Sequence, residues 1–187
     1  MATAAPDLAR YSRVAAWLHW IIAALIVVNL VLGFFHEDFE RPVRSAMMSL
    51  HKATGLTILA LTLARVAWRL GNRPPPFDPV MKRWEVGVAR AVHWSFYLLL
   101  IVLPLSGWLV VSTSGRATSW FGLFEVAPLP VTRAEDAHEL MEEVHEILAY
   151  AMLALLALHV LGAVKHHVEG HRHLIGRMAL WSRRGGP

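Results

Sequence analysis

Cysteine is absent from the 187-residue chain, and its absence excludes several classes of redox protein. Without cysteine there is no C-x-x-C-H motif for covalent haem, no thiolate set for an iron–sulfur cluster and no disulfide framework. Any redox cofactor must therefore be held non-covalently or by other ligands. Histidine is the abundant candidate, with 11 copies in the chain.

Charge is also scarce. Asp, Glu, Lys and Arg together make up 17% of the chain, whereas 56% is hydrophobic and the mean hydropathy is +0.43. Soluble domains are usually about 45–50% apolar. The excess lies in four stretches of the length that crosses about 30 Å of hydrocarbon, roughly 20 residues each. We therefore predict an all-α integral membrane protein, a four-helix bundle forming one transmembrane domain over residues 1–187.

The predicted spans are residues 14–35, 47–70, 88–112 and 142–167, and the longest loop is 113–141. Gly71 and the proline run 74–76 end the second span, because proline cannot continue a helix. Pro104 lies inside the third span and predicts a kink that neighbouring helices tolerate. The residues before Val14 lack the pattern of a cleaved signal peptide.

The basic residues predict the orientation of the bundle. Thirteen of the 18 fall on the side of the N-terminus: Arg10, Arg13, Arg65, Arg69, Arg73, Lys82, Arg83, Arg90, Lys165, Arg172, Arg177, Arg183 and Arg184. Five fall on the opposite side: Arg41, Arg44, Lys52, Arg116 and Arg133. Because Lys and Arg are enriched on the cytoplasmic side, both termini are predicted to be cytoplasmic. Basic residues beside apolar spans indicate orientation in a bilayer and not nucleic-acid binding.

The loop 113–141, which is predicted to lie on the side opposite the termini and is called the outer loop, carries two further patterns. Residues 133–144 have helical spacing and predict an amphipathic segment on the outer surface that leads to the fourth span. Trp120, Phe121 and Phe124 are typical of an interfacial aromatic anchor. Ten of the 14 acidic residues also lie on this side, from Glu37 to Glu40 and from Glu125 to Glu146.

Five histidines lie inside or at the edge of the spans, where ionisable groups are costly and indicate function: His19, His51, His93, His145 and His159. His145 and His159 are fourteen residues apart, close to four helical turns, so both point to nearly the same face. They are about 21 Å apart along the helix. His51 is predicted at the outer depth of His145, and His19 at the cytoplasmic depth of His159.

Two cross-helix histidine pairs at two depths suit two bis-histidine haems stacked across the membrane. Neutral imidazole binds haem iron from both faces, and six-coordinate iron has no open site, which favours electron transfer. A zinc site fits less well, because zinc needs three or four ligands converging at one depth.

Two interpretations of His93 remain open. It lies near the depth of His19 and His159 and is an alternative haem ligand in place of His19. His19 is better placed as the ligand, one turn into its helix. A second role for His93 is to hydrogen-bond a quinone headgroup and pass protons, joined by His166 and His167, because histidine titrates near neutral pH.

The other candidates have plainer explanations. The terminal cluster His166, His167, His171 and His173 is interpreted as a solvated basic tail, and His36 and His138 as structural or solvated loop residues. Gly33, Gly55 and Gly107 are positions where a porphyrin could approach the backbone, although helix packing is the commoner explanation. Arg13, Lys52 and Arg65 lie near the expected propionates but are commonly ordinary interfacial charges.

With these residues in hand, the chain resembles the bacterial cytochrome b561 family of four-helix, di-haem membrane proteins. The resemblance covers essentially the whole chain. The matching motifs are Tyr11-Ser12-Arg13 with Leu18-His19-Trp20, Leu50-His51-Lys52-Ala53-Thr54-Gly55, His93 with Tyr97 and Pro104-Leu105-Ser106-Gly107, Val144-His145-Glu146, Leu158-His159 and His166-His167.

The resemblance implies two non-covalent b haems, a location in the cytoplasmic (inner) membrane, and exchange with ubiquinone. Some family members are superoxide oxidases that pass electrons from periplasmic superoxide to ubiquinone. Carried over by position, His19 with His159 and His51 with His145 match the ligands, and His93 and His167 match places near a quinone site. The acidic outer loop argues against attraction of an anion, although Lys52, Arg116 and its other basic residues could form a local positive mouth.

We therefore expect a transmembrane oxidoreductase that carries electrons from a periplasmic donor, with superoxide one candidate, to ubiquinone. An alternative is a membrane-anchoring cytochrome b subunit of a dehydrogenase or hydrogenase, which would have a redox partner protein. An alternative of another class is a haem-free helical scaffold or proton-coupled transporter.

Overall fold

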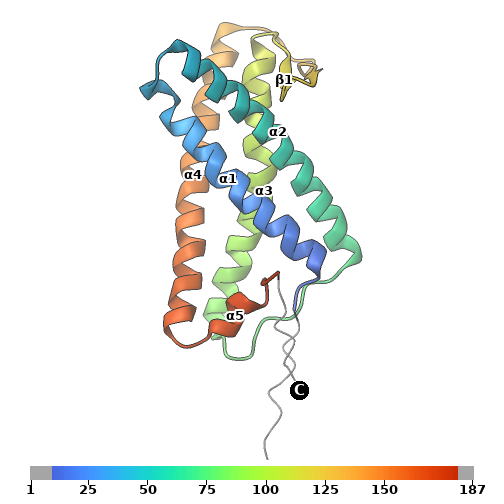
Figure 1. Ribbon diagram of the computed structural model, residues 1–187, viewed down its shortest axis with the longest axis vertical. Coiled ribbons are helices and arrows are strands. Elements are labelled where there is room, and N and C mark those ends of the chain that lie inside the picture. Colours follow the sequence, from blue (N-terminus) through green and yellow to red (C-terminus); the bar gives the residue numbers. More distant parts are fainter. Residues whose placement is uncertain (1–9, 181–187) are drawn as a thin grey trace, which may run out of the picture.

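The computed structural model describes residues 10–180, and these form four long helices with short elements between them (Figure 1). The long helices are α1 (Arg13–Phe35), α2 (Arg41–Gly71), α3 (Arg83–Thr113) and α4 (Glu135–Val168). The shorter elements are the 3-10 helix η1 (His36–Asp38), the strands β1 (Thr118–Trp120) and β2 (Phe124–Val126), and helix α5 (Arg172–Gly176).

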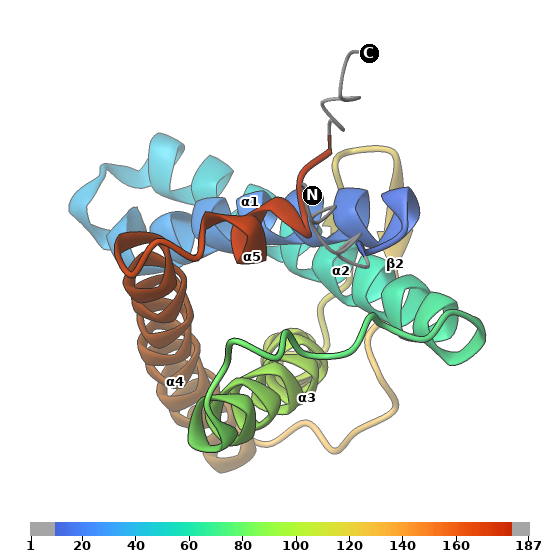
Figure 2. The ribbon, with the colours of Figure 1, turned by 90° about the horizontal axis from the view of Figure 1, so that it is seen from below.

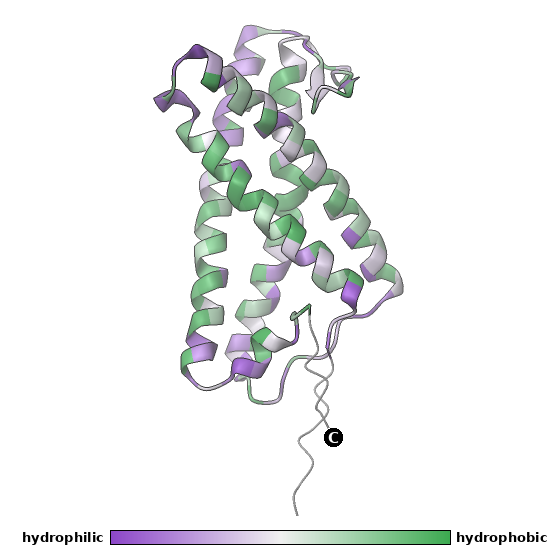
Figure 3. Cartoon of the chain, viewed as in Figure 1, coloured by the Kyte–Doolittle hydropathy of each residue, from purple (hydrophilic) through white to green (hydrophobic). Residues whose placement is uncertain are grey.

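All four long helices are long and apolar enough to cross a membrane. Each contains an 18-residue stretch with a mean hydropathy between 1.2 and 2.4, and at most 28% of the residues in any such stretch are buried in the bundle. Most apolar side chains of these stretches are therefore left exposed by the protein itself, as expected of side chains that a lipid bilayer covers. Figure 3 shows the same division, with hydrophobic colour along the helices and hydrophilic colour concentrated toward their ends. The prediction of a four-helix membrane bundle is confirmed.

The helices extend beyond three of the predicted spans. α2 begins at Arg41 and not near residue 47, α3 begins at Arg83 and not near 88, and α4 begins at Glu135 and not near 142. Hydropathy marks only the part of a helix that faces lipid, whereas the hydrogen-bonded helix continues into the polar region on either side. The predicted surface segment 133–144 is therefore mostly the first turns of α4, continuous with the span.

A small apolar core holds the bundle together halfway along its length. Its buried members are Ile22, Ile26, Ile58, Leu100 and Met152, which come from all four long helices. α3 continues as one helix through Pro104, as predicted for a proline inside the third span. The core fixes the rotation of each helix and so determines which side chains face the interior at the two ends.

The outer loop folds into a two-stranded antiparallel hairpin, which the sequence did not predict. β1 and β2 pair in the register Thr118 with Val126 and Trp120 with Phe124. The Trp120 ring stacks on Phe124 with centroids 5.0 Å apart, and its indole N–H donates to the Thr57 hydroxyl of α2 at 3.1 Å. The predicted aromatic anchor is thus attached to α2.

The C-terminal segment returns beneath the bundle to the beginning of α1 (Figure 2). The N–H of Tyr11 donates to the carbonyl of Arg177 at 3.2 Å, and the indole N–H of Trp20 donates to the carbonyl of Met178 at 2.9 Å. The first and last described residues therefore lie at the same end of the molecule. Arg183 and Arg184, counted in the orientation prediction, lie outside the described residues.

Candidate haem-binding sites

One histidine pair joins α2 to α4, and we call it the outer pair after the predicted orientation. The rings of His51 and His145 have centroids 6.1 Å apart and planes inclined at 86°. A metal–imidazole bond is about 2 Å long, so two rings on opposite sides of one iron have centroids about 6 Å apart. The separation of this pair therefore fits one metal ion ligated by both rings.

Hydrogen bonds fix the orientation of both outer rings. Nδ1 of His51 lies 3.0 Å from the carbonyl oxygen of Asn29 and donates to it. Nδ1 of His145 lies 2.9 Å from the Ser106 hydroxyl, whose own proton is donated to the carbonyl of Leu103 at 2.8 Å. With Nδ1 as the donor in each ring, the Nε2 lone pair is left for a metal. Neither acceptor was recognised from the sequence, because a backbone carbonyl carries no residue-type signal and Ser106 appeared there only as part of the Pro104-Leu105-Ser106-Gly107 motif.

Two glycines lie directly against the outer rings. A Cβ built on Gly33 would meet Cε1 of His51 at 2.9 Å, and a Cβ built on Gly107 would meet Cε1 of His145 at the same distance. These glycines were predicted either to admit a porphyrin or to pack helices. In the structure Gly33 and Gly107 leave room for the ring of a histidine, whereas a Cβ built on Gly55 would meet the Asn29 side chain at 3.7 Å.

Three histidines meet nearer the end that holds both termini, and we call them the inner cluster after the predicted orientation: His19, His93 and His159. His159 of α4 has its ring centroid 6.3 Å from that of His19 and 6.0 Å from that of His93. Phe96 packs edge-on against His159 with ring centroids 5.3 Å apart. The structure brings together all the histidines that the sequence placed at this depth, and both partners of His159 are at a separation that fits a shared metal.

Two cavities open beside the inner cluster. A small one of about 110 Å³ is lined by Arg69, Phe77, Arg90, His93, Trp94 and Tyr97. A larger one of about 560 Å³ is bounded by the segment before α1, the first turn of α1, the end of α2 and the loop after it, and shares Arg69 and Tyr97 with the first. Arg69 donates to the Tyr97 hydroxyl at 3.2 Å. His167 lies exposed at the end of α4 and lines neither cavity.

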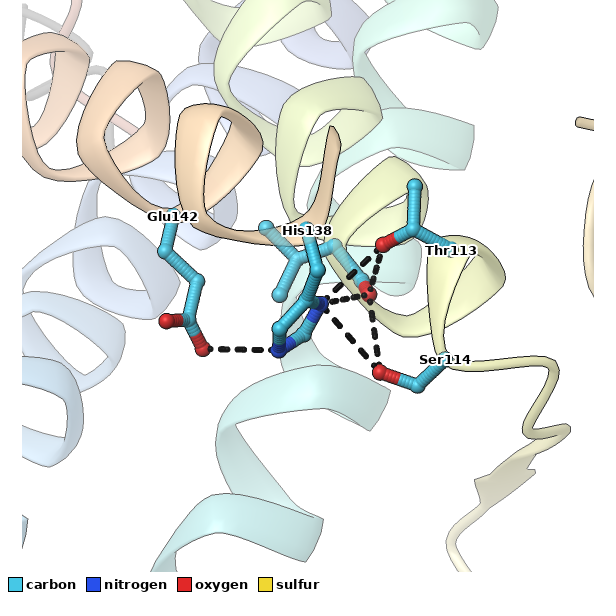
Figure 4. A network of polar contacts seen from close by, with 5 residues as sticks. Thr113, Ser114, His138 and Glu142 are labelled. Carbon is cyan, nitrogen blue, oxygen red and sulfur yellow. Dashed lines mark hydrogen bonds and ion pairs between the residues drawn. The ribbon is translucent and has the colours of Figure 1, made fainter. Parts of the chain in front are cut away.

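His138 has a structural role at the outer end of the bundle (Figure 4). Its Nδ1 lies 3.0 Å from the Thr113 hydroxyl and from the Val110 carbonyl oxygen, and 3.2 Å from the Ser114 hydroxyl. Its Nε2 lies 3.2 Å from the Glu142 carboxylate. The ring therefore ties the start of α4 to the end of α3.

Polar contacts also hold the inner ends of α3 and α4. The Lys165 ammonium contacts the carboxylates of Glu85 at 2.6 Å and Glu169 at 2.9 Å. Among the described residues, Glu85, His166 and Glu169 are the one group of three potential ligands whose atoms lie within 4.8 Å of one another. Because the ammonium already contacts both carboxylates, an ion pair is the simpler explanation of this group.

Comparison with known proteins identifies the family of this architecture. The model of the prokaryotic cytochrome b561 family matches residues 10–180. The chain belongs to this family. It is 29% identical over 171 residues to cytochrome b561 homolog 2 of Escherichia coli K12, covering 90% of both chains. It is 27% identical over 158 residues to the probable superoxide oxidase CybB of Yersinia pestis, covering 84% of this chain and 89% of the relative.

A third relative is cytochrome b562 of Cereibacter sphaeroides, 31% identical over 147 residues that cover 74% of this chain and 84% of the relative. Membership of the cytochrome b561 family confirms the resemblance found in the sequence. It implies that the chain binds haem b and acts in electron transfer as a multi-pass bacterial membrane cytochrome.

Proposed function

We propose that this cytochrome carries two b haems, one ligated by His51 and His145 and one by His19 and His159. The observation that supports this proposal is the separation of the rings, 6.1 Å in the outer pair and 6.3 Å in the inner pair. Bound haem would supply an iron that gains and loses one electron, and the imidazoles of each pair would hold that iron and favour electron transfer.

The chain's own residues prepare the two sites. Asn29 and Ser106 hold the outer rings with Nε2 free for the metal. The buried apolar core between the pairs keeps water out of the bundle. His93 is the second candidate partner of His159, but both lie in the α3–α4 hairpin. His19 lies on α1, so the pair His19 and His159 joins the α1–α2 hairpin to the α3–α4 hairpin, as the outer pair does.

We propose that electrons enter at the end that carries His51 and His145 and leave to ubiquinone at the end that carries His19 and His159. The latter end holds most of the basic residues and is assigned to the cytoplasm, with both termini. His93, Arg69 and Tyr97 supply hydrogen-bond donors beside the inner pair, suited to quinone oxygens. If superoxide is the donor, two superoxide anions each lose one electron to become dioxygen, and ubiquinone gains two electrons and two protons to become ubiquinol.

Haem content tests the central proposal. The purified protein is expected to contain two haems b per chain and to give a reduced-minus-oxidised b-type spectrum with two redox components. A preparation that binds no haem under conditions that supply haem would sink the electron-transfer proposal and favour a scaffold or transporter.

The donor is tested separately. Superoxide generated outside vesicles that contain the protein and ubiquinone should produce ubiquinol, and the rate should fall to background with His159→Ala. If the protein reduces ubiquinone only when a co-purifying dehydrogenase is present, it is an anchoring subunit and superoxide is not its donor.

A further inference from the structure

The four long helices share one spacing. Each carries two interior residues that are fourteen positions apart: His19 and Gly33 in α1, His51 and Arg65 in α2, His93 and Gly107 in α3, and His145 and His159 in α4. The first and third helices therefore match each other, as do the second and fourth. In both α1 and α3 the first of the two residues is a histidine followed by tryptophan: His19-Trp20 and His93-Trp94.

The contacts repeat as well as the spacing. His51 packs on Gly33 as His145 packs on Gly107, each with Cε1 at 2.9 Å from the position of a Cβ. Nδ1 of His51 points to the carbonyl four residues before Gly33, and Nδ1 of His145 points, through Ser106, toward the carbonyl four residues before Gly107. Such agreement in position and hydrogen bonding indicates that the α1–α2 and α3–α4 hairpins present the same surface to the outer site.

The inner site breaks this correspondence at one residue. His19 corresponds to His93, but the residue that corresponds to His159 is Arg65. Arg65 donates to the carbonyl of Ala15, one turn before His19, at 2.8 Å. It is also close enough to interact electrostatically with both His19 and His93. The four corresponding positions of the inner site, 19, 65, 93 and 159, thus hold three histidines and one arginine.

We infer that the two hairpins are versions of one haem-binding unit, and that Arg65 determines which of two corresponding residue pairs holds the inner haem. The inference rests on the proposed function. If position 65 held a metal ligand, the inner site would offer two pairs that join the hairpins. One would be His19 with His159, and the other His93 with the residue at position 65. A guanidinium is always protonated and has no acceptor, so it cannot ligate iron. Arg65 thereby makes His93 a neighbour of the haem and not its ligand.

A rescue experiment tests this inference. His159→Ala should lower the haem content from two per chain to one. Adding Arg65→His should restore it toward two, because the imidazole introduced at position 65 pairs with His93. Adding His93→Ala to that double variant should remove the rescued haem, whereas adding His19→Ala should leave it in place. The readouts are haem per protein and the low-spin signal in electron paramagnetic resonance spectra.

Arg69→His in the His159→Ala background is the matched control, because it places an imidazole one turn further along α2 and should not restore the haem. Retention of the outer haem shows that each variant is folded. A folded Arg65→His/His159→Ala protein that keeps only one haem overturns the inference, as does equal rescue by Arg69→His. If His159→Ala alone keeps both haems, the proposed ligands are wrong and the inference falls with them.

Discussion

Single contacts determine how the outer histidines are held. The ring of His145 lies between the backbone of Gly107 and the hydroxyl of Ser106, and nothing larger than a hydrogen fits on the glycine side. The ring therefore has one position, with Nδ1 engaged as a donor. Fixing a ligand through its second nitrogen is how proteins set the tautomer of a metal-binding imidazole.

Gly107→Ala is expected to weaken the outer haem site, because the new methyl group would lie 2.9 Å from Cε1 of His145. The variant should bind less of the outer haem and shift its potential, as measured by haem content and redox titration. Gly87→Ala in the same helix is the control, since nothing lies within 4 Å of a Cβ there. The control should keep both haems and gain up to about 1 kcal/mol of helix stability. Normal outer-haem binding in Gly107→Ala would contradict the close contact.

His145→Ala is expected to lower the haem content from two per chain to one and to leave the inner haem in place, because its ring pairs with His51 alone among the proposed ligands. The measurement is haem per protein together with the remaining redox component. His138→Ala, on the same helix and outside both pairs, should retain two haems. Loss of neither haem in His145→Ala would refute its assignment.

The sequence predicted which histidines meet but not what surrounds them. Helical periodicity places residues fourteen apart on one face, so depth matched His51 with His145 and left His19 and His93 as two candidate partners of His159. The carbonyls of Asn29 and Leu103 could not be foreseen, because their position depends on how far each helix is rotated. Arg65 was interpreted as an interfacial charge, since its correspondence to His159 appears only when the two hairpins are compared.

On the scale of whole helices, the inner ends of α3 and α4 are joined through one ammonium group. Lys165 contacts Glu85 of α3, whose side chain is only 8% exposed, and Glu169 just beyond α4. Removing the cation would leave a buried carboxylate without its partner, which costs more than an exposed ion pair contributes.

Lys165→Met is therefore expected to lower the thermal unfolding midpoint by several degrees in detergent. The hydrogen bond from Lys165 lowers the pKa of the Glu169 carboxyl below its ordinary value. The ion pair therefore stabilises the folded protein fully when the pH is above the ordinary pKa of a glutamate. This stability is lost as the pH falls through the lowered pKa of Glu169. The midpoints of wild type and variant should accordingly converge in acid. Arg83→Met, an exposed cation at the same end, is the control and should change the midpoint little. A difference that persists unchanged in acid would contradict this account.

The sequence predicted the number and type of long helices well and their ends poorly. Hydropathy detects the lipid-facing middle of α2, α3 and α4, but their polar first turns look like loop. The β1–β2 hairpin was missed because strands of three residues are too short to show alternation. Its position depends on the tertiary contact between Trp120 and Thr57.

For the whole molecule, the two ends differ in charge. The end that carries His51 and His145 has ten acidic and five basic residues, so it repels an anion approaching from solution. This repulsion acts between exposed charges and is screened over a Debye length of about 10 Å at 0.1 M salt.

If superoxide is the donor, its rate of oxidation is therefore expected to rise with ionic strength, the reverse of an enzyme that attracts the anion. The measurement is superoxide-driven ubiquinol formation across a salt series, with an uncharged reductant as the control, which should show little change. Glu142→Lys should raise the rate at low salt. A rate that falls as salt is added would show that the local basic residues, and not the acidic surroundings, steer the donor.

Both histidine pairs depend on α4, the last of the four long helices to be synthesised. α4 supplies one histidine to each pair, His145 to the outer and His159 to the inner, while the partners His51 and His19 come from helices made earlier. During translation, three helices are therefore inserted with unmatched histidines, and neither pair exists until the last long helix enters the membrane. If the two pairs hold the proposed haems, loading of both depends on this same late step, and a ribosome that stalls before α4 leaves a membrane-inserted chain unable to assemble either site.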